Sequence, residues 1–237
     1  MRRIFTLAWF IAKDFFRSWQ SFVPLTLALT FYGLAFQYGA TPAYFAAVTP
    51  VAMIVITIVT VLLLAGRCNR AASYPFIARL RARAEMLLAV VLTALALTLV
   101  LTTLVTGMAL WQDKFTTPLT GREWVLLALI WPCLFLCAGF FGLLLTNLTS
   151  RGSSHIMVYA LIAALAAVYD YQFELTQAGQ NFLLAVWRRI LDPFSITLTP
   201  FSSANLLQGA LLVLGYAFLC FIVADWLFAR KDLVWSE

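Results

Sequence analysis

Charged residues are scarce in this chain. Asp, Glu, Lys and Arg make up only 11% of its 237 residues, whereas apolar residues make up 63%. Soluble domains carry about 25% charged residues, which solvate their surface. The composition therefore excludes a water-soluble globule and predicts a protein that lies in lipid.

Recognisable catalytic patterns are missing as well. The chain has no G-x-x-x-x-G-K-[ST] nucleotide loop and no H-E-x-x-H zinc motif. Its one histidine, His155, stands beside Ser153 and Ser154 at the edge of an apolar run. A Ser/His pair in an intramembrane protease would lie inside the bundle with an oxyanion hole, so we read His155 as a solvated loop residue. The sequence predicts no catalysis, cofactor or metal in this chain.

Disulfides are not expected. None of the four cysteines falls in a predicted outer loop, where oxidation would join them. Cys133 and Cys137 are four residues apart on one helix face, but no nearby His or acid completes a metal site. We interpret both as small packing residues.

Six long apolar runs are present, and each is long enough to approach the ~30 Å of a bilayer core as a helix. Lipid leaves backbone groups no partner outside the helix, and these runs lack the alternation of membrane strands. The fold is therefore predicted as all-α and polytopic, in a single domain. The predicted spans are Phe22–Tyr38, Phe45–Gly66, Met86–Leu110, Trp124–Leu145, Ile156–Tyr171 and Leu206–Phe228.

Basic residues fall very unevenly on the two sides of these spans. Because Lys and Arg favour the cytoplasm, the richer side predicts cytoplasmic N- and C-termini. The charge is dispersed over separate segments, which argues against a nucleic-acid surface. The poorer side holds Lys114, Arg122, Arg188 and Arg189, and the other twelve of the 16 basic residues lie on the richer side.

The first twenty residues predict a helix in the membrane interface. The apolar run Ile4–Ala12 is followed by Lys13 and Asp14 with no small-residue cleavage site, so it is not a typical signal peptide. In the segment Arg2–Gln20, a polar stripe that includes Arg3, Lys13 and Arg17 runs along an aromatic-rich cylinder. This pattern is typical of helices that lie in the plane of a membrane.

Residues 67–85 form the largest predicted cytoplasmic loop. Ser73 and Pro75 suit the start of a helix. One interpretation is a basic anchor for lipid headgroups. The other, which we favour, is a docking helix for a soluble partner. Its predicted contact residues are Tyr74, Pro75, Phe76, Arg79, Arg81 and Arg83.

The outer segment 172–205 is also unusual. It joins an apolar run, Phe182–Val186, to a stretch rich in Pro, Ser and Thr from Pro193 to Ser203. The run is too short for a full span, so we expect a re-entrant or interfacial hairpin before the last span.

Polar side chains within the spans are mostly threonines. Hydroxyls in lipid usually bond to their own or a neighbouring helix; the alternative is a mildly polar lining for a substrate path. Asp170 and Asp225 are predicted near span ends, so no charge marks the midplane where an ion-coupled transporter would need one. The candidate lining residues are Thr57, Thr60, Thr98, Thr102 and Thr106.

Together, these features resemble the permease subunits of ATP-binding cassette transporters of the ABC-2 (type V exporter) group. The resemblance rests on the interfacial helix, six spans with both ends inside, the basic loop helix, the outer hairpin and the tail from Phe228 to Leu233. The sequence differs from many members after the second span, where Gly66-Arg67-Cys68-Asn69 has no acidic residue. It also has no fused ATPase.

The resemblance implies a dimer of permease subunits bound to two ATPase chains, which would hold ATP and Mg. It implies a bacterial inner-membrane exporter. The aromatic-rich, uncharged spans favour an amphipathic or lipid-like cargo, and export of haem, a peptide or a drug fits nearly as well. Two alternatives remain open: an autonomous channel or secondary transporter, and a non-transporting membrane scaffold.

Overall fold

The computed structural model describes residues 2–68, 83–146 and 206–230. Within these ranges the secondary structure is helical apart from turns and one isolated bridge. The elements are α1 (Arg2–Phe16), the 3₁₀ turn η1 (Trp19–Ser21), α2 (Phe22–Ala35), α3 (Pro42–Cys68), α5 (Arg83–Trp111), α6 (Gly121–Leu144) and α9 (Leu206–Arg230).

Four helices are long and apolar enough to cross a membrane: α3, α5, α6 and α9. Each contains the corresponding predicted span almost entirely, so the prediction of a polytopic, all-α membrane protein is supported in this part of the chain. In the predicted span Phe22–Tyr38, the helix is shorter than predicted: α2 ends at Ala35 after 14 residues. The predicted span Ile156–Tyr171 and the hairpin 172–205 lie outside the described residues.

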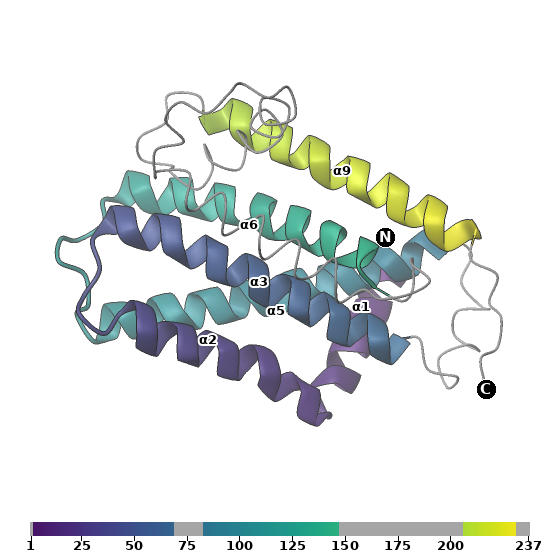
Figure 1. Ribbon diagram of the computed structural model, residues 1–237, viewed down its shortest axis with the longest axis horizontal. Helices are drawn as coiled ribbons and strands as arrows, with labels where there is room; N and C mark the ends of the chain where they lie inside the picture. Colours follow the sequence, from purple (N-terminus) through teal and green to yellow (C-terminus); the bar gives the residue numbers. More distant parts are fainter. Residues whose placement is uncertain (1, 69–82, 147–205, 231–237) are drawn as a thin grey trace, which may run out of the picture.

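The long helices lie side by side in one bundle (Figure 1). Helices α3 and α6 run in the same direction, α5 runs against them, α2 lies along α3 and α5, and α9 lies along α6. Glycines let α6 approach α3 closely, as is common between membrane helices. A Cβ built on Gly142 would lie 3.5 Å from the Ile58 Cα and 3.4 Å from the Val61 Cβ.

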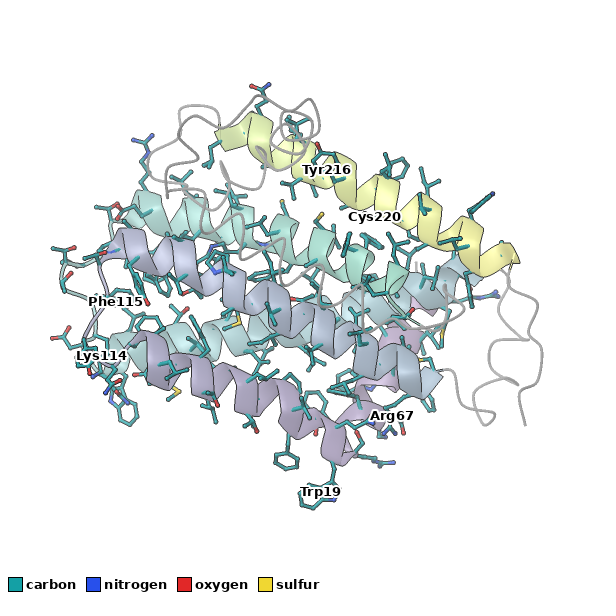
Figure 2. All side chains as sticks on the ribbon, viewed as in Figure 1. Trp19, Arg67, Lys114, Phe115, Tyr216 and Cys220 are labelled. Carbon is teal, nitrogen blue, oxygen red and sulfur yellow. The ribbon has the colours of Figure 1, made fainter. Side chains whose placement is uncertain are left out.

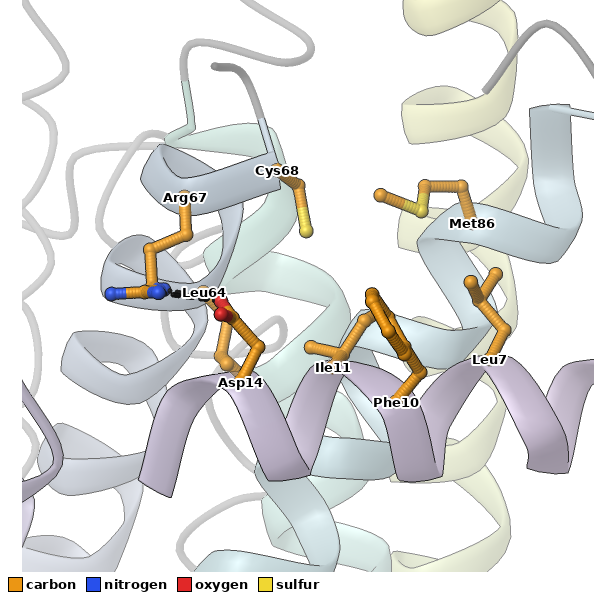
Figure 3. A pocket seen from close by; sticks show the side chains of 8 residues that line it. All are labelled: Leu7, Phe10, Ile11, Asp14, Leu64, Arg67, Cys68 and Met86. Carbon is orange, nitrogen blue, oxygen red and sulfur yellow. Dashed lines mark hydrogen bonds and ion pairs between the residues drawn. The ribbon is translucent and has the colours of Figure 1, made fainter. Parts of the chain in front are cut away.

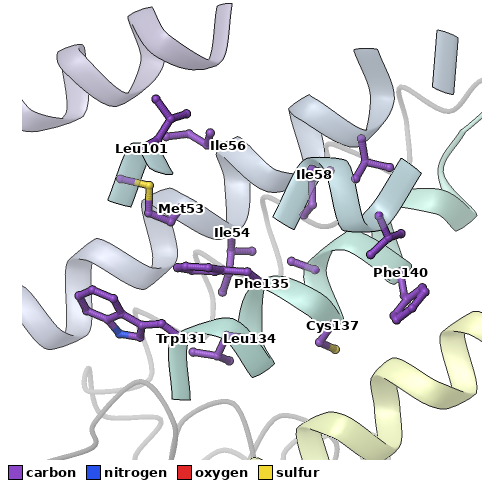
Figure 4. Close-up of a cluster of buried hydrophobic side chains, with 14 of the residues drawn as sticks. Met53, Ile54, Ile56, Ile58, Leu101, Trp131, Leu134, Phe135, Cys137 and Phe140 are labelled. Atoms are coloured by element: carbon purple, nitrogen blue, oxygen red, sulfur yellow. The ribbon is translucent and has the colours of Figure 1, made fainter. Parts of the chain in front are cut away.

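The apolar core lies between α3, α5 and α6. Figure 4 shows Ile54 and Ile58 of α3 together with Phe135 and Phe140 of α6 in this cluster. Met53 and Phe135 are fully buried there. Because lipid is as apolar as these side chains, the stabilisation comes from their close van der Waals packing.

One end of the bundle is closed by the connections before α3 and α6. Gly39 adopts φ +86°, a conformation that favours glycine, and brings Ala40 against the α5–α6 connection. The Ala40 N–H donates to the Lys114 carbonyl at 2.8 Å, and the Thr116 N–H donates to the Ala40 carbonyl at 3.1 Å. A cluster of aromatic rings fills this end behind the bridge: Tyr32, Phe36, Phe45, Phe115, Trp124 and Trp131.

Helix α6 begins at a capping box. The Glu123 N–H lies 3.4 Å from the Thr120 hydroxyl, and the Thr120 N–H donates to the Glu123 carboxylate at 2.7 Å. This exchange satisfies donors that the helix start would otherwise leave unpaired. It fixes the helix start at Gly121, three residues before the predicted start of the span at Trp124.

Candidate functional site at the junction of α1, α3 and α5

Helix α1 lies across one end of the bundle. Figure 3 shows its axis running crosswise to the long helix α9. The helical segment predicted over Arg2–Gln20 is interrupted: α1 ends at Phe16, and the 3₁₀ turn η1 covers Trp19–Ser21. The Ser18 hydroxyl donates to the Phe15 carbonyl at 2.7 Å, which occupies an acceptor at the helix end.

The inner face of α1 is packed against the bundle. Ile11 and Phe15 are buried, whereas Trp9 is 74% exposed and Trp19 is 87% exposed. The Thr93 hydroxyl of α5 lies 2.8 Å from the Ala89 carbonyl of its own helix and 3.1 Å from the Ala8 carbonyl of α1. The Thr93 hydroxyl proton thus links α5 to a backbone carbonyl of α1. This link does not depend on which side chain residue 8 carries.

A small groove lies where α1 meets the end of α3 and the start of α5 (Figure 3). Its volume of about 60 Å³ is sufficient for a few water molecules and well below the roughly 300–1,000 Å³ of drug-sized ligand pockets. We therefore treat it as a joint between helices rather than as a cargo site. The groove is lined by Leu7, Phe10, Ile11, Asp14, Leu64, Arg67, Cys68 and Met86.

An ion pair spans this groove. The Arg67 guanidinium donates to one carboxylate oxygen of Asp14 from Nε at 2.9 Å and from Nη2 at 2.5 Å. The Arg67 side chain is 19% exposed and that of Asp14 is 53% exposed, so solvent screens the attraction in part. The pair couples α1 to the last turn of α3, one residue before Cys68 and the start of segment 69–82.

Basic residues gather at this end of the bundle. Figure 2 shows Arg67 and Trp19 toward one end and Lys114 at the other. Within the described ranges, only Lys114 and Arg122 belong to the opposite end. In the described helices near the junction, Arg2, Arg3 and Lys13 belong to α1, Arg17 follows it, Arg67 lies in the last turn of α3, Arg83 begins α5 and Arg230 ends α9. The fold thus brings segments that are far apart in the sequence to one basic end.

The predicted docking residues fall mostly outside this description. Tyr74, Pro75, Phe76, Arg79 and Arg81 lie outside the described residues, and Arg83 is the first residue of α5. Their partner contacts stay a prediction. The predicted interfacial residues Arg3 and Lys13 are exposed on α1, and Arg17 is exposed in the turn that follows it.

The candidate lining threonines lie mainly in helix contacts. Thr57 donates to the Met53 carbonyl at 2.6 Å, and its oxygen is 3.0 Å from the Thr98 oxygen on α5. Because one hydroxyl carries one proton, Thr98 is the donor between them. Thr60 bonds the Ile56 carbonyl and Thr102 the Thr98 carbonyl, at 2.7 and 2.8 Å. Such bonds within and between helices are what the packing interpretation expects. A role of these threonines in lining a substrate path stays a prediction.

Several functional candidates were not singled out from the sequence. Asp14 gave no signal as a partner of Arg67, because 53 residues separate them. Pro50 and Pro132 lie inside α3 and α6. A proline within an apolar run of span length is a readable signal, since it removes a backbone bond at membrane depth.

No protein-family model matches this chain, and no curated protein is significantly similar to it.

Proposed function

We propose that this chain is the membrane-spanning permease subunit of an ATP-binding cassette transporter of the ABC-2 group. In this proposal two copies, each with six spans and cytoplasmic termini, work with two separate ATPase subunits. The cargo is amphipathic or lipid-like and moves outward across a bacterial inner membrane. The chain itself holds no nucleotide; the ATPases hold ATP and Mg.

The observation that carries the proposal is the joint between α1 and α3. A crosswise amphipathic helix is linked by Asp14–Arg67 to a long apolar helix, at the point where the basic segment 69–82 begins. A soluble partner that pushes on this segment would displace the end of α3 and α1 together. Such a joint supports the transfer of force from a partner into the helix bundle.

The arrangement of the later helices supports the six-span topology. Helix α6 ends at the basic end of the bundle, and α9 begins at the opposite end (Figure 1). The chain between α6 and α9 must therefore return from the basic end to the opposite end. This is consistent with the predicted fifth span, Ile156–Tyr171. Helix α2, which covers roughly 21 Å, would cross with local thinning of the bilayer.

The decisive test replaces Arg79, Arg81 and Arg83 by Glu in the intact chain. Since these arginines are proposed to make charge-assisted contacts with an acidic ATPase surface, the triple variant should lose co-purification of the ATPase and vanadate-sensitive ATP hydrolysis. A matched control reverses Lys114 and Arg122 at the opposite end. If the triple variant retains normal partner binding and hydrolysis, the docking assignment is wrong.

A second candidate is an autonomous secondary transporter. The prolines inside α3 and α6 favour it, because each removes a backbone hydrogen bond at a depth where transport sites often lie. Purified protein in liposomes distinguishes the two. Flux of a fluorescent lipid from this chain alone, without ATP or a second protein, supports the autonomous transporter and contradicts the permease.

A further inference from the structure

The two prolines lie level with one another in neighbouring parallel helices. A Cβ built on Gly139 of α6 would lie 3.9 Å from the Thr57 side chain of α3, so these two residues meet. Pro50 precedes Thr57 by seven residues, and Pro132 precedes Gly139 by seven. Seven residues are about two helical turns, so both prolines lie about 10 Å from this contact toward the same end.

Each proline weakens its helix at this level. Proline has no N–H, so the carbonyls of Ala46 and Ala128 do not receive the usual bond from the residue four positions later. Inside a membrane, such carbonyls need a neighbouring hydroxyl or an ordered water. Two parallel helices with this feature at one level form a polar layer within an apolar bundle.

Polar side chains at the same level have buried atoms without a hydrogen-bond partner. They are the Thr49 hydroxyl and the Trp131 indole N–H, each directly before a proline. Thr49 is fully buried and Trp131 is 6% exposed. The Trp131 ring packs against Phe45, one turn before Thr49, with ring centroids 5.3 Å apart. The Trp131 ring therefore lies in the α3–α6 contact, one helical turn from Thr49.

A third unpartnered atom comes from α5. The Thr106 oxygen is buried without a partner, although parts of this residue are accessible. Thr106 lies eight residues beyond Thr98, and Thr49 lies eight residues before Thr57, the residue that Thr98 contacts. Because α3 and α5 are antiparallel, both lie about 12 Å from that contact toward the same end. Three neighbouring helices each contribute one unsatisfied polar group to this layer.

We propose that this layer is a binding site for an ordered water molecule held by Thr49, Thr106 and Trp131. The occupant must accept a bond from the indole N–H, which excludes a bare cation. It must also be neutral, because the described parts of α3, α5 and α6 carry Asp, Glu, Lys and Arg only near their ends. Buried waters typically make about three bonds to such groups. This inference does not depend on the transport proposal.

The direct test observes the Trp131 indole by NMR in detergent micelles. The full chain is labelled with ¹⁵N at tryptophan, and the Trp131 signal is identified by its loss in Trp131→Phe. We expect a cross peak between this N–H and the water resonance. An indole N–H that shows cross peaks only to protein side chains overturns the proposal.

A second test uses Thr49→Val and Thr106→Val, which remove a hydroxyl and keep the shape. If both residues hold one water, each variant lowers the melting temperature by roughly 2–4 °C, and the double variant lowers it by less than the sum. In a dry contact, each variant would remove an unpaired polar group and raise the melting temperature. Thr60→Val, which removes a hydroxyl already bonded to Ile56, is the control. A rise in either variant, or fully additive losses, contradicts a shared water.

Discussion

At the scale of single residues, glycine determines how closely the central helices pack. A Cβ built on Gly139 would lie 3.0 Å from the Val91 Cγ1, which is closer than side chains normally approach. Gly33 and Gly107 have nothing within 4 Å of the same position. Glycines inside similar apolar helices thus differ in whether a neighbouring helix packs directly against them.

Gly139→Ala tests this contact. The new methyl group must push Val91 aside, and because β-branched side chains are stiff, we expect a loss of about 1–3 kcal/mol of unfolding free energy. The measurement is reversible unfolding in mixed micelles, followed by circular dichroism.

Gly107→Ala is the matched control, and it should be neutral or slightly stabilising because alanine favours helices. Adding Val91→Ala to Gly139→Ala should recover part of the loss. If Gly139→Ala behaves like Gly107→Ala, the close contact of α5 and α6 is wrong.

At the scale of elements, α1 is the least conventional part of the fold. The sequence predicts a polar stripe on a helix in the membrane interface, and Arg3, Lys13 and Arg17 are exposed. The structure shows that α1 also has a buried face. Ile11 and Phe15 are buried in the bundle, and Asp14 pairs with Arg67 of α3. The attachment of α1 to the bundle thus includes apolar packing, the Asp14–Arg67 ion pair and the hydrogen bond from the Thr93 hydroxyl to the Ala8 carbonyl.

Breaking the ion pair should affect coupling more than stability. Because both side chains are partly exposed, Asp14→Asn should cost no more than about 1 kcal/mol of unfolding free energy. If the pair transmits force from the ATPase, the same variant should lower cargo-stimulated ATP hydrolysis in the reconstituted complex by a larger factor.

The charge exchange Asp14→Arg with Arg67→Asp should restore hydrolysis in part, and Asp113→Asn at the opposite end serves as the control. Equal activity of Asp14→Asn and the unmodified chain would show that the pair is only structural.

At the scale of the whole molecule, the helices differ in how much they are enclosed. About half of the most apolar window is buried in α3, α5 and α6, but only 17% in α9. Among the described helices, α9 packs mainly on α6 and to a smaller extent on α5, and its Leu207, Phe218 and Trp226 are exposed. Its outer face is available to lipid, and in the proposed dimer to a second subunit.

The orientation of the bundle can be measured by thiol labelling. In a variant with the four native cysteines replaced, Lys114→Cys should react with a membrane-impermeant maleimide in intact cells. Lys13→Cys should react only after permeabilisation, since positive charge retains its end in the cytoplasm. The reverse pattern would place the Asp14–Arg67 joint outside the cell and exclude the ATPase-docking proposal.

Much of the helical architecture was readable from the sequence because lipid imposes simple rules. Continuous apolar runs in lipid must be helices, and the predicted span Phe45–Gly66 lies within the helix α3. The predicted span continued to Tyr38, but α2 ends at Ala35. Phe36 packs against Phe45 and Phe115 in the turn that follows, whereas Tyr38 is exposed. The Asp14–Arg67 joint could not be predicted, since its partners meet only through tertiary packing.

By itself, the sequence determined that the chain lies in a membrane, that its spans are helices and that its charge is divided unequally between two sides. These properties follow from local composition, because each apolar run must satisfy its own backbone bonds. Only the tertiary structure decided which helices are neighbours, and thus that Asp14 meets Arg67 and that Pro50 lies level with Pro132. Such pairings depend on the crossing and register of packed helices, where a single glycine such as Gly139 sets the distance of approach.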